Sequence, residues 1–255
     1  MQGHSHPITI SIDTIARIFN KMGFDVVDGP ELEDEWHNFD ALNVPADHPA
    51  RDMQDTFWIK DKIGENKYGE KVGYVLRTHT SNMQIRTMEK YVKENMPMPI
   101  AIVCPGKVYR NEATDATHEA QFHQVEMLYV STDASLAMMI GVTQKFLSEF
   151  FGSKHELKIR LRSSYFPFVE PGNEVDMQCF KCKGNGCNIC KNSGWIEIGG
   201  AGMVHPKVLE SSGIDPAQYR GFAFGCGIDR LAMLKWGLDD VRLLYNGDLR
   251  VVNQF

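Results

Sequence analysis

Apolar residues recur every three to four positions in three stretches of the chain, and this spacing predicts three amphipathic helices. The first stretch is SIDTIARIFNKMGF, residues 11–24, in which Ser11 is a candidate N-cap and Gly23 a candidate C-cap. The second is SNMQIRTMEKYVKEN, and the third is SLAMMIGVTQKFLSEFFG, which closes at Gly152. The apolar stripe of the first helix consists of Ile12, Ile15, Ile18, Phe19 and Met22.

Five other segments are apolar runs or alternating patterns bounded by turn residues, which predicts strands. They are PIAIVC, QFHQVEMLYV, KIRLRSSYFPFV, GWIEIGG and GFAFGCGI. Helices and strands do not alternate regularly, and the later strands follow one another through turns. We therefore expect an α+β fold, an antiparallel sheet flanked by helices, and not a doubly wound parallel sheet.

Length and composition fit one large domain with an insertion, because 255 residues can bury a substantial core. No apolar run approaches the roughly 18 residues that a membrane span needs, so we expect a soluble protein without a membrane segment. The start, MQGHSHPITI, lacks the pattern of a secretory signal, which predicts a cytoplasmic location. A net charge of −6 argues against a stand-alone nucleic-acid-binding module. The negative net charge does not exclude RNA as a substrate that a partner protein helps to present.

Two predicted strands carry an aromatic ring and a carboxylate on the same face. In QFHQVE, alternation places Phe122, Gln124 and Glu126 on one side, and His123, Val125 and Met127 on the other. In YFPFVEPG, Phe166, Phe168 and Glu170 line up in the same way. One such strand alone is more simply a solvated face. Two of them in one sheet predict a concave floor with rings for an apolar group and carboxylates for a cation.

Two arginines follow strand-like segments and are candidates for phosphate binding. Arg110 and Glu112 stand in KVYRNE, and an arginine can hold a phosphate with two donors, although a surface ion pair explains Arg110 equally well in isolation. Arg230 follows Gly225 and Gly227 in GFAFGCGIDRL. This GxG is not a dinucleotide motif, since the GxGxxG spacing and the helix-opening context are missing.

Four cysteines form two CxxC pairs in CFKCKGNGCNIC, residues 179–190. Cys179, Cys182, Cys187 and Cys190 have the spacing of two knuckles around a short glycine-containing turn, which predicts a tetrahedral structural Zn²⁺ site. Reduced thiols or a vestigial knuckle are the alternative, and a redox CxxC lacks its usual βαβ surroundings. Strand-like segments flank the cluster, so the metal would clamp the tip of a hairpin. Cys104 and Cys226 lie on apolar strands and are expected to be buried.

Taken together, several strings resemble class II aminoacyl-tRNA synthetases, and most closely the family of bacterial phenylalanyl-tRNA synthetase alpha subunits. YRNE and QFHQVE are similar to motif 2 of that class, and GFAFGCGIDRL is similar to motif 3. The region MGFDVVDGPELEDEWHNFDALNVPADHPARDMQDTFWI is similar to motif 1. The resemblance covers essentially the whole chain and includes GHSHPIT, RTHTSNMQIR, DATHEAQFHQVE, YFPFVEPG, GAGMVHP and DLRVVNQF.

The resemblance implies an enzyme that activates L-phenylalanine with ATP and transfers it to tRNA(Phe). It implies that Arg110 and Arg230 act on the phosphates, that Glu112 contacts the adenine amino group and that Phe122 stacks on the purine. His118 and Gly227 complete the implied ATP site. His79, Ser81, Gln124 and Glu126 would contact the substrate amine and carboxylate, and Trp58, Phe166, Phe168, Ala223 and Gly225 would surround the ring. For His79 and His118, a satisfied core histidine is the alternative.

The resemblance also implies Mg²⁺ bound by Glu170 at the junction with a beta subunit, and an (αβ)₂ heterotetramer with motif 1 at the interface. Editing is expected in the beta subunit. Residues 1–255 would form the catalytic domain, residues 175–197 the cysteine-rich insertion, and the family's N-terminal coiled coil would be absent. Two other hypotheses stay open. One is an adenylate-forming homologue that does not charge tRNA, and the other is a non-catalytic homologue that binds an amino acid or RNA.

Overall fold

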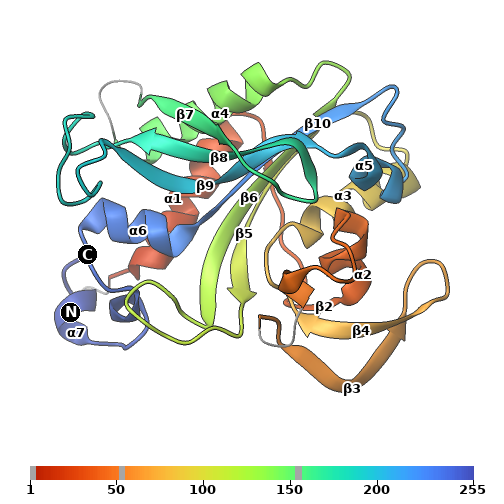
Figure 1. The fold of residues 1–255 in the computed structure, drawn as a ribbon, viewed down its shortest axis with the longest axis horizontal. Helices are drawn as coiled ribbons and strands as arrows, with labels where there is room; N and C mark the ends of the chain where they lie inside the picture. Colours follow the sequence, from red (N-terminus) through yellow and green to blue (C-terminus); the bar gives the residue numbers. More distant parts are fainter. Residues whose placement is uncertain (1–3, 52–54, 153–156) are drawn as a thin grey trace.

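A computed structural model describes residues 4–51, 55–152 and 157–255, and a seven-stranded sheet forms its centre (Figure 1). The strand order is β1-β5-β6-β10-β9-β8-β7. β1 is parallel to β5, and each of the other neighbouring pairs is antiparallel. The expected α+β architecture is confirmed, with one parallel pair added at the edge. The strands are β1 (Asp25–Val26), β5 (Ile100–Tyr109), β6 (Gln121–Ser131), β7 (Ile159–Ser163), β8 (Val169–Gln178), β9 (Trp195–Val204) and β10 (Arg220–Gly227).

A second sheet of three strands lies beside the first, in the order β2-β4-β3 (Figure 1). Its strands are β2 (Leu32–Asp34), β3 (Trp58–Glu65) and β4 (Lys71–Leu76). The sequence pattern did not reveal these strands, because most of β3 is exposed and carries lysines and acids. Three residues of the motif 1 region, 52–54, lie outside the described part of the chain.

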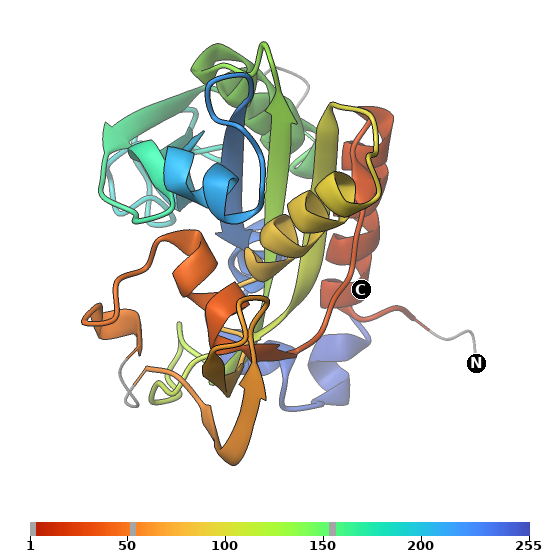
Figure 2. The same cartoon turned by 90° about the vertical axis from the view of Figure 1, so that its right-hand side faces the viewer.

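Helices cover the two faces of the large sheet and create two apolar cores. α1 (Pro7–Lys21), α4 (Leu136–Phe150) and α6 (Ile228–Trp236) pack on the face that carries Val125 and Met127. α2 (Glu35–Asn38), α3 (Asn82–Lys93) and α5 (Pro206–Ser211) pack on the face that carries Leu128 and Ala223, together with the small sheet. Figure 2 shows α1 and α3 on opposite sides of β5. The remaining elements are η1 (Asp40–Leu42), η2 (Pro49–Arg51), η3 (Val241–Leu244) and α7 (Leu249–Val252).

The first helix begins five residues earlier than predicted, because its N-cap is His6 and not Ser11. Pro7 occupies its first turn, where a missing N–H costs nothing, and His6 is the N-cap that accepts a hydrogen bond from the Ile8 N–H at 3.2 Å. Ser11 is therefore a buried residue inside α1 and not its cap. The predicted end is correct, since Gly23 follows the C-cap with a positive φ of 84°. The other two helices, α3 and α4, match their predictions closely.

The segment predicted as one long strand, residues 158–169, is a strand followed by a tight turn. β7 ends at Ser163, and Phe166 forms an isolated bridge to Val169, the first residue of β8. Pro167 explains the break, because proline cannot donate a hydrogen bond to a strand ladder. Phe166 and Phe168 therefore lie in a turn, and the shared strand face that was expected for them and Glu170 does not form. In the described residues, no helix is long and apolar enough to cross a membrane.

Candidate functional site

A cavity of about 330 Å³ opens between the turn at residues 166–168 and the strands β6, β9 and β10. Carboxylate, amide and guanidinium groups lie in its wall together with aromatic rings and bare backbone. Its lining residues are His79, Ser81, Arg110, Gln124, Glu126, Phe166, Phe168, Val169, Ile198, Gly199, Gly200, Ala201, Ala223, Phe224, Gly225, Cys226 and Gly227. Ten of the site residues named from the sequence are among them: His79, Ser81, Arg110, Gln124, Glu126, Phe166, Phe168, Ala223, Gly225 and Gly227.

Glu126 is the carboxylate of the cavity, and β6 holds it in place. Ser81 donates its hydroxyl hydrogen to Glu126 Oε2, and Gln84 Nε2 donates to the same oxygen at 2.9 Å. Burial raises the pKa of Glu126 to about 7, although these two hydrogen bonds and the charge of Arg110 act in the opposite direction. The group can thus change its charge near neutral pH, and it is a ready partner for a cation.

Two buried polar atoms beside Glu126 have no partner within the described chain. They are Nδ1 of His79 and Oε1 of Gln124. Burial and the charge of Arg110 lower the pKa of His79 to about 3, so its imidazole is neutral. An unpaired acceptor or donor in a cavity wall is costly unless a ligand or water satisfies it. Both atoms therefore mark the place where a polar ligand group is expected to bind.

An apolar slot adjoins this polar group. The rings of Phe166 and Phe168 stack with centroids 5.9 Å apart, and Ala223 lies at the floor. Asn43 Nδ2 fixes the turn from the side of the small sheet by donating to the Pro167 carbonyl at 2.8 Å. An aromatic side chain fits such a slot of small and planar groups.

Two glycines keep the slot open. A Cβ atom on Gly225 would lie 2.8 Å from Glu126 Cγ, and one on Gly200 would lie 3.0 Å from the Phe166 ring. Larger residues at either position would displace the carboxylate or the ring. The absence of side chains at these two positions of β9 and β10 thus leaves the space that forms the cavity.

Arg110 supplies positive charge to the cavity lining. Its guanidinium lies over the Phe122 ring, 5.1 Å from the centroid. Burial lowers the pKa of Arg110, while Glu112 and Glu126 act against that effect. Arg230 is exposed at the first turn of α6 next to Gly227, and it forms no ion pair with the residues that the structure describes. Both arginines are available to an anion.

Five of the residues predicted for phenylalanine and ATP are not part of the cavity lining: Trp58, Glu112, His118, Phe122 and Arg230. Trp58, the first residue of β3, stacks on Phe39 with centroids 6.2 Å apart. His118 stands on the exposed loop after β5, where its Nδ1 lies 3.0 Å from Asp115. Glu112 follows Arg110 on the same loop and is also outside the cavity lining. The roles expected for these residues toward a substrate stay predictions.

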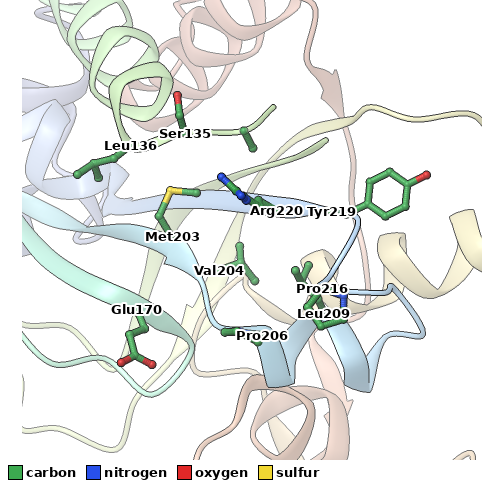
Figure 3. A pocket seen from close by; sticks show the side chains of 12 residues that line it. Ser135, Leu136, Glu170, Met203, Val204, Pro206, Leu209, Pro216, Tyr219 and Arg220 are labelled. Atoms are coloured by element: carbon green, nitrogen blue, oxygen red, sulfur yellow. The ribbon is translucent and has the colours of Figure 1, made fainter. Parts of the chain in front are cut away.

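Glu170 lies in a separate groove of about 440 Å³ (Figure 3). Figure 3 shows Glu170 and Tyr219 at opposite ends of this groove, with Met203 and Val204 between them. The Glu170 side chain is 74% exposed, and His205 Nε2 lies 3.3 Å from its carboxylate. It is thus accessible to another chain, but it does not share a cavity with Glu126.

Sequence reasoning missed the contributions of Gln84 and of β9. Gln84 stands in a predicted helix, and nothing in the period of that helix distinguishes it from a surface residue. The repeated glycines in GWIEIGGAG, residues 194–202, were the available signal for β9, because strand glycines mark close approach. Cys226 also borders the cavity, but it is only 4% exposed, in agreement with the predicted burial.

The cysteine cluster lies where it was predicted, at the tip of the β8–β9 hairpin. The two strands pair up to Gln178 and Trp195, and the Sγ atoms of the four cysteines all lie within 4.8 Å of one another. Burial raises the pKa of the Cys190 thiol, but N–H groups of Cys187 and Gly194 outweigh it and hold the pKa at about 6. A convergent set of four soft sulfur ligands with a stabilised thiolate fits Zn²⁺.

Comparison with known proteins agrees with these observations. A family model described as tRNA synthetases class II core domain (F) matches residues 1–255. The phenylalanine–tRNA ligase alpha subunit of Staphylococcus haemolyticus is 51% identical over 253 residues, which are 99% of this chain and 67% of that protein. The alpha subunit from Acetivibrio thermocellus is 51% identical over 255 residues, 100% of this chain and 70% of that protein. Pyrrolysyl-tRNA synthetase from Desulfitobacterium hafniense shares the fold, with a TM-score of 0.69, 18% identity, and coverage of 95% of this chain and 74% of that one.

Proposed function

Because the chain belongs to the class II tRNA synthetase core family, and within it to the phenylalanine–tRNA ligase alpha subunits, we propose that it activates L-phenylalanine with ATP and transfers it to tRNA(Phe). The observation that carries this proposal is a carboxylate beside an aromatic slot. Glu126, held by Ser81 and Gln84, matches a substrate ammonium group. The slot of Phe166, Phe168 and Ala223 matches a phenyl ring.

In the first step, an oxygen of the phenylalanine carboxylate attacks the α-phosphorus of ATP. The bond between that phosphorus and the oxygen that bridges to the β-phosphate breaks, and pyrophosphate leaves. The substrate supplies its own nucleophile, so the protein has to position it and stabilise charge. Arg110 and Arg230 carry out the second task, Phe122 stacks on the purine, and Glu112 contacts the adenine amino group. In the second step, a terminal ribose hydroxyl of tRNA attacks the acyl carbon and AMP leaves.

Glu126, His79 and Gln124 hold the polar end of phenylalanine in this proposal. Glu126 pairs with the ammonium group, and the unpartnered atoms of His79 and Gln124 gain the partners that they lack. Such contacts fix the reacting carboxylate in line with the phosphate near Arg110.

Glu170 is proposed as a Mg²⁺ ligand at the junction with a beta subunit, in an (αβ)₂ assembly. Its exposure supports this, because a shared ion needs a carboxylate that the partner chain can reach. An ion held by Glu170 would link the two subunits, since this carboxylate lies outside the cavity proposed for the substrates. The cytoplasmic location expected from the sequence stays a prediction.

Zn²⁺ in the cysteine cluster is proposed to hold the shape of the β8–β9 hairpin. β9 provides Gly199 and Gly200 to the cavity, so the metal would stabilise one wall of it at a distance. A Cβ on Gly194 would lie 2.4 Å from the Gly184 carbonyl oxygen, and this close backbone approach keeps the knuckle compact.

Phenylalanine-dependent ATP–pyrophosphate exchange and tRNA(Phe) charging, each with and without a co-expressed beta subunit, test the proposal. We expect both activities in the complex, and their loss on Arg110→Ala. The control Arg17→Ala, an exposed position on α1, should leave both unchanged. Exchange without charging under any condition would favour the adenylate-forming homologue. No exchange at all would favour the non-catalytic homologue.

A further inference from the structure

A side chain, and not a strand, pairs with β6 at the place where β10 ends. The ladder between the two strands stops at the pair Gln124 and Gly227. The next residue of β6, His123, donates its backbone N–H to Asp229 Oδ2 at 2.7 Å. Asp229 is only 4% exposed and lies in the first turn of α6. The carboxylate therefore extends the ladder by one residue and ties the start of α6 to β6.

The second oxygen of this carboxylate is also occupied. The Tyr245 hydroxyl donates to Asp229 Oδ1, and His123 Nδ1 lies 3.0 Å from the same hydroxyl. The rings of His123 and Tyr245 stack with centroids 6.3 Å apart. Tyr245 comes from the C-terminal segment, and His6 Nε2 fixes that segment at the Leu244 carbonyl, 2.9 Å away. Asp229 is thus held on both sides by groups from distant parts of the chain.

This arrangement has a consequence for the neighbouring arginine. Arg230 follows Asp229 directly, is exposed, and forms no ion pair in the ranges that the structure describes. Within the described residues, no hydrogen bond or ion pair holds the Arg230 side chain, so the backbone of α6 sets its position. His123 in turn lies between Phe122 and Gln124 on β6. The Asp229 carboxylate therefore links the residue proposed for the purine with the arginine proposed for the phosphates.

We propose that Asp229 is a positioning residue that sets Arg230 against ATP through its hydrogen bonds to His123 and Tyr245. This inference rests on the ATP role of Arg230 given above. The phenylalanine end of the cavity, at Ser81 and Glu126, is held by other contacts. Loss of the Asp229 carboxylate should consequently affect ATP and leave phenylalanine binding nearly unchanged.

The test is pyrophosphate exchange by the complete complex, with the KM for ATP and the KM for phenylalanine measured separately. Asp229→Ala should raise the KM for ATP by roughly tenfold, the size expected for the loss of about one hydrogen bond to a charged group. The KM for phenylalanine should stay within about twofold, since its contacts remain. Asp229→Asn should restore the parental value, because its amide oxygen still accepts from His123 and its amide nitrogen can donate to Tyr245.

A double variant distinguishes a role of Asp229 in positioning Arg230 from a general contribution to the stability of the fold. In an Arg230→Ala background, Asp229→Ala should add no further increase in the KM for ATP, because Asp229 acts through Arg230. If Asp229→Ala does not fold, Tyr245→Phe removes one of the two hydrogen bonds and should give a smaller increase, confined to ATP. An equal increase in both KM values, additive effects in the double variant, or an unchanged KM for ATP in Asp229→Ala would overturn the inference while leaving the proposed function intact. An unchanged KM for ATP in Arg230→Ala alone would overturn both.

Discussion

Phenylalanine affinity should depend on pH through Glu126. The pKa of this carboxyl is raised by burial to about 7, from an ordinary value of 4.5, and only its ionised form attracts the substrate ammonium group. About a tenth of the protein is ionised at this site at pH 6 and about nine tenths at pH 8, and the apparent affinity scales with that fraction. Binding should therefore be about tenfold weaker at pH 6 than at pH 8.

The same pKa predicts an effect on stability with the opposite trend. Because the folded form holds its proton more tightly than the unfolded chain, the stability contribution of Glu126 is fully present below pH 4.5 and is lost as the pH rises through about 7. The difference between 7 and 4.5 corresponds to about 3 kcal/mol. Without substrate, Glu126→Gln should thus be more stable than the parent by up to about 3 kcal/mol at pH 8, and this advantage should largely disappear by pH 5.

Calorimetric titration of phenylalanine at pH 6, 7 and 8 measures the first effect, and denaturant unfolding at pH 5 and 8 measures the second. Glu126→Gln should bind weakly and without pH dependence. His79 cannot produce the trend, since its pKa of about 3 keeps it neutral throughout this range. A parental affinity that does not change between pH 6 and 8, or an equal slope in Glu126→Gln, would refute the role given to this carboxylate.

Three further predictions concern the slot and the cluster. Ala223→Gly should enlarge the slot and admit para-substituted phenylalanines in pyrophosphate exchange, at a cost of about 1 kcal/mol in stability; activation of them no better than by the parent would contradict the placement of the ring. Gly225→Ala should weaken phenylalanine binding by roughly tenfold or more, because its Cβ would lie 2.8 Å from Glu126 Cγ. The control Gly141→Ala, with nothing within 4 Å of its Cβ, should not change binding. Equal effects of the two substitutions would exclude the steric explanation. Elemental analysis should find one Zn²⁺ per chain, and Cys182→Ser should lower both that content and the melting temperature; a stably folded, metal-free protein would remove the claim.

The positions of site residues were predicted best where they follow from the alternation of side chains within a single strand. Alternation along β6 placed Gln124 and Glu126 on one face and Met127 on the other, and the structure confirms both assignments. The hairpin around the cysteines was predictable for the same reason, because its strands are neighbours in the chain. Alternation along β10 likewise places Ala223 and Gly225 on one face of that strand. Both residues line the cavity.

Features that depend on distant contacts could not be predicted. α1 begins where His6 can serve as its cap, and His6 is itself held by Leu244 at the other end of the chain. The turn at Phe166–Phe168 is fixed by Asn43. Trp58 of β3 packs against Phe39, a contact that the local pattern did not indicate, and its assignment to the substrate ring stays a prediction. Each of these depends on residues that no local period brings together.

The most direct test of this account is a crystal structure of the complex with a non-hydrolysable phenylalanyl-adenylate analogue. We expect the phenyl ring between Phe166, Phe168 and Ala223, the ammonium group on Glu126, and the phosphate mimic at Arg110. An analogue bound elsewhere, for example in the groove that contains Glu170, or one bound with its amine away from Glu126, would contradict it.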